Sequence, residues 1–426
     1  MSIGRRAFFT TSALTGGAIA APALAQSTRA TAEAPGREAA VPVRTGADLL
    51  AADRWQALAG RKVGVLANPT GALTNLSHIV DDMVEAGHRP LAAFGPEHGF
   101  RGTAQAGGSE GGYKDPRTGI PVYDAYGASV DKLAGYFHKA GIDTLVFDIA
   151  SVGARFYTYI WSMYTAMRAA VRTGASFVVL DRPNPIGGQA FGPMLDPEFA
   201  SGVGLKPITQ QPGMTVAELA KLFDARFLPG DEGRGLAKLE IHRCQGWRRD
   251  RFFAETGQPW IMPSPNMPTA DTALVYPGTC MFEGTNLTTG RGTTRPFEII
   301  GAPGIDWRWA QALNALDLPG VRFAETYFVP TFSDFAGKTC GGVALHVQTP
   351  HRFDPIRTGV AMLVTAKRTY PSLFGWRKDN WIDKLTGSAR LRTMLDKGAD
   401  TEDIVGAWQP ELEEFRRTRR PFLLYS

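Results

Sequence analysis

Hydrophobic and polar positions along the chain alternate between short β-branched runs and longer segments with apolar residues at helical spacing. The run "KVGVLANPTG" (62–71) predicts a buried strand that ends at an Asn-Pro turn. Apolar residues at helical spacing in "LSHIVDDMVEAG" (76–87) predict a helix that stops at a glycine, and "RPLAAFGPEHG" (89–99) supplies a second short apolar run. Together these segments predict a β-α-β unit with parallel strands.

The same alternation continues further along the chain. A helix is predicted over 130–141, a strand over 143–149, a long helix over 157–174, and a strand that breaks into a Pro/Gly loop over 176–188. Short strands that alternate with helices of about ten residues or more are typical of a parallel sheet covered on both faces. In such sheets the carboxyl ends of the strands open onto the binding crevice.

The second half of the chain has a different sequence pattern. It begins with many turn-forming residues and little periodicity, and predicted helices and strands follow. A strand is predicted over 341–349, a helix around 357–371 and a closing helical segment over 401–419. We therefore expect an α/β fold, with a parallel-sheet domain over 47–265 followed by a smaller α/β (α+β) domain over 266–426.

The N-terminus has the features of an export signal. Arg5 and Arg6 precede a short apolar stretch, and Ala23-Leu24-Ala25 fits a small-residue cleavage site. The adjacent arginines predict a twin-arginine signal over 1–25, and the Ala/Pro/Thr-rich segment 26–46 predicts a disordered tether. The expected location is the periplasm, with no stable membrane insertion after cleavage.

Overall composition is that of a soluble globular protein, with 44% hydrophobic and 20% charged residues in 426. The net charge of +5 includes two locally basic segments, "RRDR" (248–251) and "FRRTRRPF" (415–422). Neither interleaves arginines with aromatics in the way that nucleic-acid sites do, so solvated helix ends are expected and no nucleic-acid partner.

The cysteine count limits the structural chemistry available to the chain. Three cysteines, Cys244, Cys280 and Cys340, exclude a disulfide framework but allow one bridge, for which we expect Cys280 and Cys340. Their spacing does not match a zinc site, and no metal is expected.

The loop "FGPEHGFRG" (94–102) places a glutamate at the carboxyl end of the second predicted strand. Held by a Gly-Pro turn, Glu97 is positioned to act as a general acid. His98 lacks a second histidine at metal-ligand spacing, so we expect it to orient its neighbours by hydrogen bonding, with Arg101 close by.

A second polar loop, "EGTNLTTGRGTTRPFE" (283–298), is too long for a hairpin turn. Its charged and amide residues are Glu283, Asn286, Arg291, Arg295 and Glu298. Loops of this kind inside compact domains are usually functional, although these arginines could instead pair with the two glutamates and rigidify the structure. A phosphate loop is excluded because its lysine is missing.

The segment "SVGARFYTYIW" (151–161) opens a helix after the third predicted strand. Arg155 is therefore expected to face the crevice, and Tyr157 to offer an aromatic face to a sugar. The absence of a G-x-S-x-G elbow argues against acyl transfer, and "ANPTGALTN" after the first strand argues against a nicotinamide cofactor.

Several long motifs are similar to those of one family. "FGPEHGFRG", "DPRTGIPVYDAYG" (115–127), "SVGARFYTYIW", "VLDRPNPIGG" (179–188), "PGMTVAEL" (212–219) and the segment 262–303 resemble the exo-β-N-acetylmuramidase (NamZ) family, glycoside hydrolase family 171. The similarity runs from about residue 62 to the C-terminus. It implies a Rossmann-like domain, a smaller auxiliary domain and an active site in the cleft between them.

The resemblance also implies a reaction: release of terminal β-1,4-linked N-acetylmuramic acid from the non-reducing end of peptidoglycan fragments, in cell-wall recycling and without a cofactor. Glu97 would protonate the leaving oxygen. The second group is left open between Glu283, Glu298, Asp181 and the substrate's own acetamido group. The expected catalytic residues are Glu97, His98 and Glu283, and the expected substrate-binding residues are Asn68, Arg101, Arg155, Tyr157, Asp181, Asn184, Asn266, Asn286, Arg291, Arg295 and Glu298.

This chain departs from the family pattern at a few positions. Ala150-Ser151, Phe191 and Pro212 stand where the family commonly has polar residues. A carbohydrate-binding protein without catalysis, or a glycosidase with another sugar preference, therefore remains an alternative.

Overall fold

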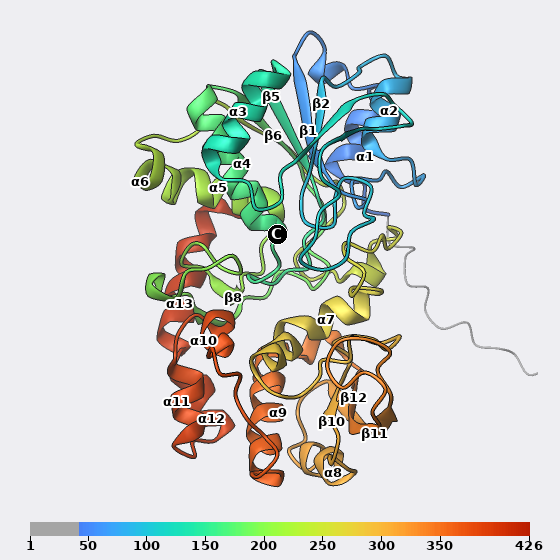
Figure 1. Cartoon of the computed structure of the whole chain (residues 1–426). Coiled ribbons are helices and arrows are strands. Elements are labelled where there is room, and N and C mark those ends of the chain that lie inside the picture. The colour runs from blue at the N-terminus through green and yellow to red at the C-terminus, as the bar shows by residue number, and fades with distance from the viewer. Residues whose placement is uncertain (1–41) are drawn as a thin grey trace, which may run out of the picture. The chain divides into compact units, whose positions relative to one another are not determined.

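The computed structural model describes residues 42–426 (Figure 1). The predicted signal peptide (1–25) and most of the predicted tether lie outside these residues. No helix among the described residues is both long enough and apolar enough to cross a membrane.

A seven-stranded, mostly parallel sheet forms the first lobe, in the strand order β3-β4-β2-β1-β5-β6-β9. The central pair, β1 and β5, runs parallel with Leu66 opposite Phe147, and every residue of both strands is buried. Only β3 runs antiparallel to its neighbour, at one edge. The strands are β1 (Val63–Ala67), β2 (Ala92–Gly95), β3 (Tyr113–Lys114), β4 (Pro121–Asp124), β5 (Thr144–Asp148), β6 (Ser176–Leu180) and β9 (Leu239–His242).

Helices cover both faces of this sheet, as the alternation of strands and helices predicted (Figure 1). Because side chains alternate across a strand, Leu66 and Phe147 pack with α3, α4 and α5, while Val65 and Val146 pack with α1 and α2 on the other face. These helices are α1 (Gly46–Ala52), α2 (Ile79–Glu85), α3 (Val130–Ala140), α4 (Tyr159–Thr173) and α5 (Val216–Arg226), and α6 (Leu228–Glu232) follows α5.

The second lobe is built on a three-stranded antiparallel sheet, β10-β12-β11. Its strands are β10 (Ile299–Ala302), β11 (Val321–Phe328) and β12 (Cys340–Val347). Its helices are α7 (Ala270–Thr279), α8 (Arg308–Asn314), α9 (Pro355–Thr369), α10 (Trp381–Thr386), α11 (Arg390–Asp396), α12 (Thr401–Gly406) and α13 (Gln409–Arg419). A short pair, β7 (Phe191–Met194) and β8 (Thr209–Gln211), belongs to the connecting chain. One hydrophobic cluster extends through both lobes, so the domain boundary near residue 265 stays a prediction.

Residues 42–46, the last part of the predicted tether, contact the first lobe. Val43 is buried against Cys244 and Trp247, and its backbone N–H donates to Thr256 O at 2.8 Å. The Thr45 hydroxyl accepts from Asp48 N and caps α1. Residues 42–46 are therefore part of the fold, because Val43 gains more by burial than a solvated linker would.

The last residues of the chain return to the first lobe. The Tyr425 hydroxyl donates to Asp181 Oδ2 at 2.5 Å, Leu424 N donates to Glu218 Oε1 at 2.7 Å, and Arg249 N donates to Ser426 O at 2.9 Å. Asp181 follows β6, so this C-terminal segment closes one end of the parallel sheet.

The expected bridge between Cys280 and Cys340 is wrong. Both thiols are free and buried, and so is Cys244. Cys280 Sγ lies 3.8 Å from Glu283 Oε2, whereas Cys340 Sγ lies 3.7 Å from Lys338 O. The two side chains face different surroundings, and the hydrophobic core provides the cohesion that a bridge would otherwise supply.

Candidate active site

One pocket is lined by residues from both lobes and from both predicted functional loops. We call it the two-glutamate pocket. It brings together six of the expected residues, Glu97, His98, Tyr157, Asn266, Glu283 and Arg291. Glu97 and His98 follow β2, Tyr157 precedes α4, and Glu283 lies just after α7 in a 3₁₀ turn, Cys280–Gly284. The prediction that the carboxyl edge of the sheet faces a pocket agrees with this geometry.

Glu97 is held by two hydrogen bonds. Its Oε2 accepts from the Thr158 hydroxyl at 2.8 Å, and its Oε1 accepts from Gly107 N at 2.8 Å. Thr158 is the N-cap residue of α4, and its hydroxyl makes no capping hydrogen bond there. A hydroxyl can donate to a carboxylate and can also accept from a carboxylic acid. The contact with Thr158 can therefore persist whether Glu97 is ionised or protonated.

Glu283 has a different kind of partner. Its Oε1 accepts from Arg291 Nη2 at 2.7 Å and from Arg291 Nε at 3.1 Å, and the guanidinium lies 5.0 Å from the centre of the Phe297 ring. A guanidinium only donates hydrogen bonds and stays protonated, so Glu283 has a cationic partner. The pocket thus contains one glutamate bonded to neutral donors and one paired with an arginine.

Two residues of the pocket have strained backbone. His98 has φ of 70° and Phe297 has φ of 64°, in the left-handed region that bulky side chains rarely adopt. Each such residue costs about 1–3 kcal/mol, a cost that is concentrated at functional sites. Both residues line the pocket, which is a further reason to regard it as the functional site.

His98 is fixed by its own loop. Its Nδ1 lies 3.0 Å from Ala104 O, and its backbone N–H donates to Gly108 O at 3.0 Å. Because a carbonyl oxygen only accepts, the Nδ1 carries the proton and the Nε2 is left as an acceptor. This contact fixes the orientation of the His98 ring, as the expected orienting role requires. Within residues 42–426, no group of three or more His, Cys, Asp or Glu side chains could hold a metal ion.

Arg155 does not face the crevice as expected. Its side chain is fully buried and donates to Pro193 O at 3.1 Å, Ile208 O at 3.0 Å and Leu385 O at 2.7 Å. These carbonyls belong to the β7–β8 region and to α10. Arg155 therefore ties the start of α4 to the second lobe and cannot reach a sugar from this position.

Two other charged candidates are used by the first lobe itself. Arg101 pairs with Asp81 at 2.8 Å and with Asp115 at 2.9 Å. Asp181 accepts from the Thr215 hydroxyl and from Ala217 N, in addition to Tyr425. Burial raises the pKa of Asp181 to about 7. Neither residue lines the two-glutamate pocket.

The remaining candidates also lie outside this pocket and satisfy neighbouring groups. Asn68 accepts from Thr70, Asn184 donates to Met214 O, and Asn286 bridges Leu373 O and Gly375 N. Glu298 accepts from the Thr272 hydroxyl at 2.5 Å, with Arg295 at 3.4 Å. The alternative of a rigidifying role for the 283–298 loop thus fits Glu298 and Arg295, whereas Glu283 and Arg291 face the pocket.

Thr158 is the residue that the sequence analysis missed. A threonine directly before an apolar helical run is a helix-start signal, so the position of Thr158 at the start of α4 could be predicted from the sequence. Tyr276, which also lines the pocket, gave no such signal because an aromatic residue at helical spacing usually belongs to the core.

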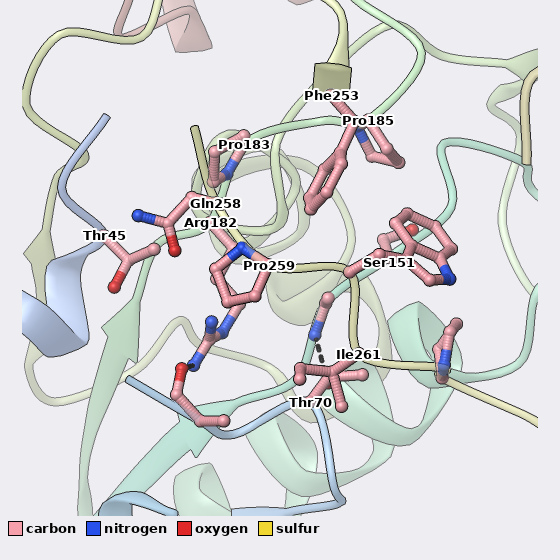
Figure 2. A pocket seen from close by; sticks show the side chains of 14 residues that line it. Thr45, Thr70, Ser151, Arg182, Pro183, Pro185, Phe253, Gln258, Pro259 and Ile261 are labelled. Carbon is pink, nitrogen blue, oxygen red and sulfur yellow. Dashed lines mark hydrogen bonds between the residues drawn. The ribbon is translucent and has the colours of Figure 1, made fainter. Parts of the chain in front are cut away.

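A second pocket, which is small and mostly apolar, lies along the same edge of the sheet (Figure 2). Figure 2 shows Pro183, Pro185, Phe253, Pro259 and Ile261 around one space. Ala150 and Ser151, which depart from the family pattern, also line it. The pocket is adjacent to the two-glutamate pocket, since the Tyr159 hydroxyl of the latter donates to Pro263 O of the former at 2.5 Å.

Known proteins match the chain over nearly its whole length. The family description "Exo-beta-N-acetylmuramidase NamZ, N-terminal" matches residues 63–271, and its C-terminal counterpart matches residues 274–425. The chain is 42% identical over 422 residues to the peptidoglycan beta-N-acetylmuramidase NamZ of Bacillus subtilis, covering 98% of this chain and 99% of that protein.

Two solved structures of DUF1343 family proteins from Bacteroides fragilis share the fold. One has a TM-score of 0.81 and 30% sequence identity, and the match covers 91% of this chain and 100% of the solved chain. The other has a TM-score of 0.73 at 29% identity and covers 90% and 99%. Matches to both halves of the family description, together with a relative of this identity and coverage, show that the chain belongs to the exo-β-N-acetylmuramidase NamZ family.

Proposed function

We propose that the protein is an exo-acting glycoside hydrolase that releases terminal, non-reducing β-1,4-linked N-acetylmuramic acid from peptidoglycan fragments. The observation that carries the proposal is the pair of glutamates in one pocket, each with a different kind of partner. Glycosidases need two groups with different protonation states. Membership of the family and the name of the Bacillus subtilis relative support the same activity.

In this proposal Glu97 is the general acid. It protonates the leaving glycosidic oxygen while the sugar ring gains oxocarbenium character. The Thr158 hydroxyl donates to Glu97 Oε2, which leaves the acid proton free for the glycosidic oxygen and holds the carboxyl group in place through the step. His98, fixed by Ala104, keeps the turn that presents Glu97.

Glu283 has the role of the second carboxyl group in this proposal. Held by Arg291, it is suited to stabilise the positive charge of the transition state or to direct a water molecule. Arg291 donates hydrogen bonds from its Nε and Nη2 to Glu283 Oε1. Its Nη1 edge is then the proposed contact for the lactyl carboxylate of muramic acid, a role that the sequence analysis shared among Arg155, Arg291 and Arg295.

The test is release of N-acetylmuramic acid from a MurNAc–GlcNAc disaccharide by the purified mature protein. We expect release by the parent protein and a loss of about a hundredfold or more in Glu97→Gln. Glu413→Gln, which changes an exposed glutamate on α13, is the matched control and should keep full activity. If the parent binds the disaccharide but releases nothing, the protein is a receptor for the sugar and the proposed hydrolysis is wrong.

We also propose that the chain is exported by the twin-arginine route and acts in the periplasm. The support is the paired arginines, the apolar stretch and the Ala-Leu-Ala site in residues 1–25. N-terminal sequencing of the secreted protein should start at Gln26, and changing Arg5 and Arg6 to lysine should keep the protein in the cytoplasm. Export of that double variant at the parental rate would contradict the twin-arginine route.

A further inference from the structure

The two basic segments of the sequence, far apart along the chain, meet in one groove. Arg248 and Arg249 come from the loop after β9, whereas Arg416, Arg419 and Arg420 come from α13 and the turn that follows it. All five arginines line the same depression, which we call the arginine groove. It shares no lining residue with the two-glutamate pocket.

Acidic residues of the protein neutralise only part of this charge. Arg249 pairs with Glu218 at 2.7 Å, Arg248 pairs with Asp250 at 2.9 Å, and Arg416 pairs with Glu413. Asp250 is the acidic side chain among those that line the groove, and the terminal residue Ser426 lines it as well. Five arginine side chains therefore outnumber the anionic groups of the lining.

Two guanidinium groups are left without a carboxylate. Arg419 is buried and donates to the carbonyl oxygens of Gly188, Pro212 and Gly213, which carry no net charge. Arg420 is exposed and forms no side-chain hydrogen bond or ion pair within the described part of the chain. Burial and then the neighbouring charge of Arg249 lower the pKa of Arg419 to about 10. The groove thus brings like charges close enough to repel one another.

A favourable interaction with the helix dipole explains only some of these residues. Basic side chains in the last turn of α13 complement the partial negative charge of the helix C-terminus. That effect places Arg416, Arg417 and Arg419 but does not bring Arg248 and Arg249 to the same depression. A bound anion would stabilise all of them together, because it relieves the repulsion between neighbouring guanidinium groups.

We propose that the arginine groove binds an anion that carries multiply charged phosphate. A guanidinium offers two parallel N–H donors that match the oxygens of phosphate, and phosphate carries more charge per group than a carboxylate. The phosphate belongs to a soluble compound or to a phospholipid headgroup, and the two sources present the same chemistry to the groove. This inference does not depend on the proposed hydrolysis.

The experiment is isothermal titration calorimetry of the full mature protein with pyrophosphate, at low ionic strength, with sodium chloride of equal ionic strength as the reference. We expect saturable binding that weakens about tenfold or more in Arg420→Gln and in Arg248→Gln. Both residues are exposed, so both variants should fold. Arg322→Gln, an exposed arginine of β11 that pairs with Asp317, is the matched control and should bind as the parent does.

A second arm separates the two sources. Sedimentation with phosphatidic acid vesicles, whose headgroup is a multiply charged phosphate monoester, compared with phosphatidylcholine vesicles, tests for a headgroup. Sedimentation that Arg420→Gln abolishes, without pyrophosphate binding, would assign the groove to the lipid headgroup. Absence of binding in both arms, or equal weakening by Arg322→Gln, would overturn the proposal.

Discussion

Replacing Thr158 with valine removes one hydroxyl from the two-glutamate pocket and keeps the branched shape of the side chain. The bond that is lost joins the Thr158 hydroxyl to Glu97 Oε2 at 2.8 Å. A hydrogen bond to a charged group is worth about 1.5–3 kcal/mol. Glu97 is partly exposed, and Gly107 N still holds its other oxygen, so we take the lower value. A loss of about 1.5 kcal/mol in the transition state corresponds to a roughly tenfold lower rate.

The assay is the initial rate of N-acetylmuramic acid release from the disaccharide, measured as kcat and kcat/KM for Thr158→Val. We expect kcat to fall about tenfold with little change in KM, because the bond positions the acid and does not touch the ground-state sugar. Thr173→Val is the matched control: Thr173 is in the same helix, α4, and its hydroxyl donates to Ala169 O at 3.0 Å. It should keep the parental rate.

A double-mutant cycle tests the mechanism of the effect. If Thr158 acts through Glu97, adding Thr158→Val to Glu97→Gln should cause little further loss, since the group that Thr158 positions is already inactive. An equal tenfold loss in both backgrounds would refute the reasoning. An unchanged kcat in the single variant would refute it as well.

Three further predictions follow from buried groups. Arg155→Met should lower the free energy of unfolding by about 3 kcal/mol, because three carbonyl oxygens lose their hydrogen-bond donor. The measurement is the midpoint of urea unfolding, which should fall. A raised KM at unchanged stability would instead support a substrate-binding role for Arg155. Burial lowers the pKa of His78 to about 4, below its unfolded value near 6.5, so the contribution of His78 to stability is present above pH 6.5 and is lost as the pH falls toward 4. In His78→Asn the melting temperature should therefore depend less on pH between 6.5 and 4. An equal decline in melting temperature in both proteins would contradict this. All three thiols should be unreactive toward a thiol reagent in the native protein and react after denaturation, with no effect of dithiothreitol on the melting temperature.

Local patterns predicted the elements that carry their own signals. The helix over 130–141 appears as α3, and Gly141 ends it in the left-handed conformation that favours glycine. The strand over 143–149 appears as β5, with all its residues buried. The position of Glu97 after β2 followed from the rule that parallel strands point their carboxyl ends toward one edge. These features depend on neighbours within a few residues, which is why the sequence contained them.

Side-chain partners far along the chain were not predictable in this way. Arg155 donates to the carbonyl groups of Ile208 and Leu385, which are 53 and 230 residues away in the sequence. A local sequence pattern does not predict such distant partners. Asp181 is equally misleading, since its partner Tyr425 is 244 residues away. Both residues sit in motifs shared with the family, and both serve the architecture in this structure. A motif identifies a residue that matters without showing whether it meets a substrate or another part of the chain.

The hydrogen bond between Tyr425 and Asp181 can form only after the last residues of the chain have been synthesised. A ribosome that has made the whole parallel sheet has not yet made the hydroxyl that Asp181 needs, nor the backbone N–H of Leu424 that Glu218 accepts from. A nascent chain must therefore keep the end of β6 incompletely satisfied until translation is nearly finished. Ribosome-bound chains that stop before residue 423 should consequently be more sensitive to protease near Asp181 than the released protein.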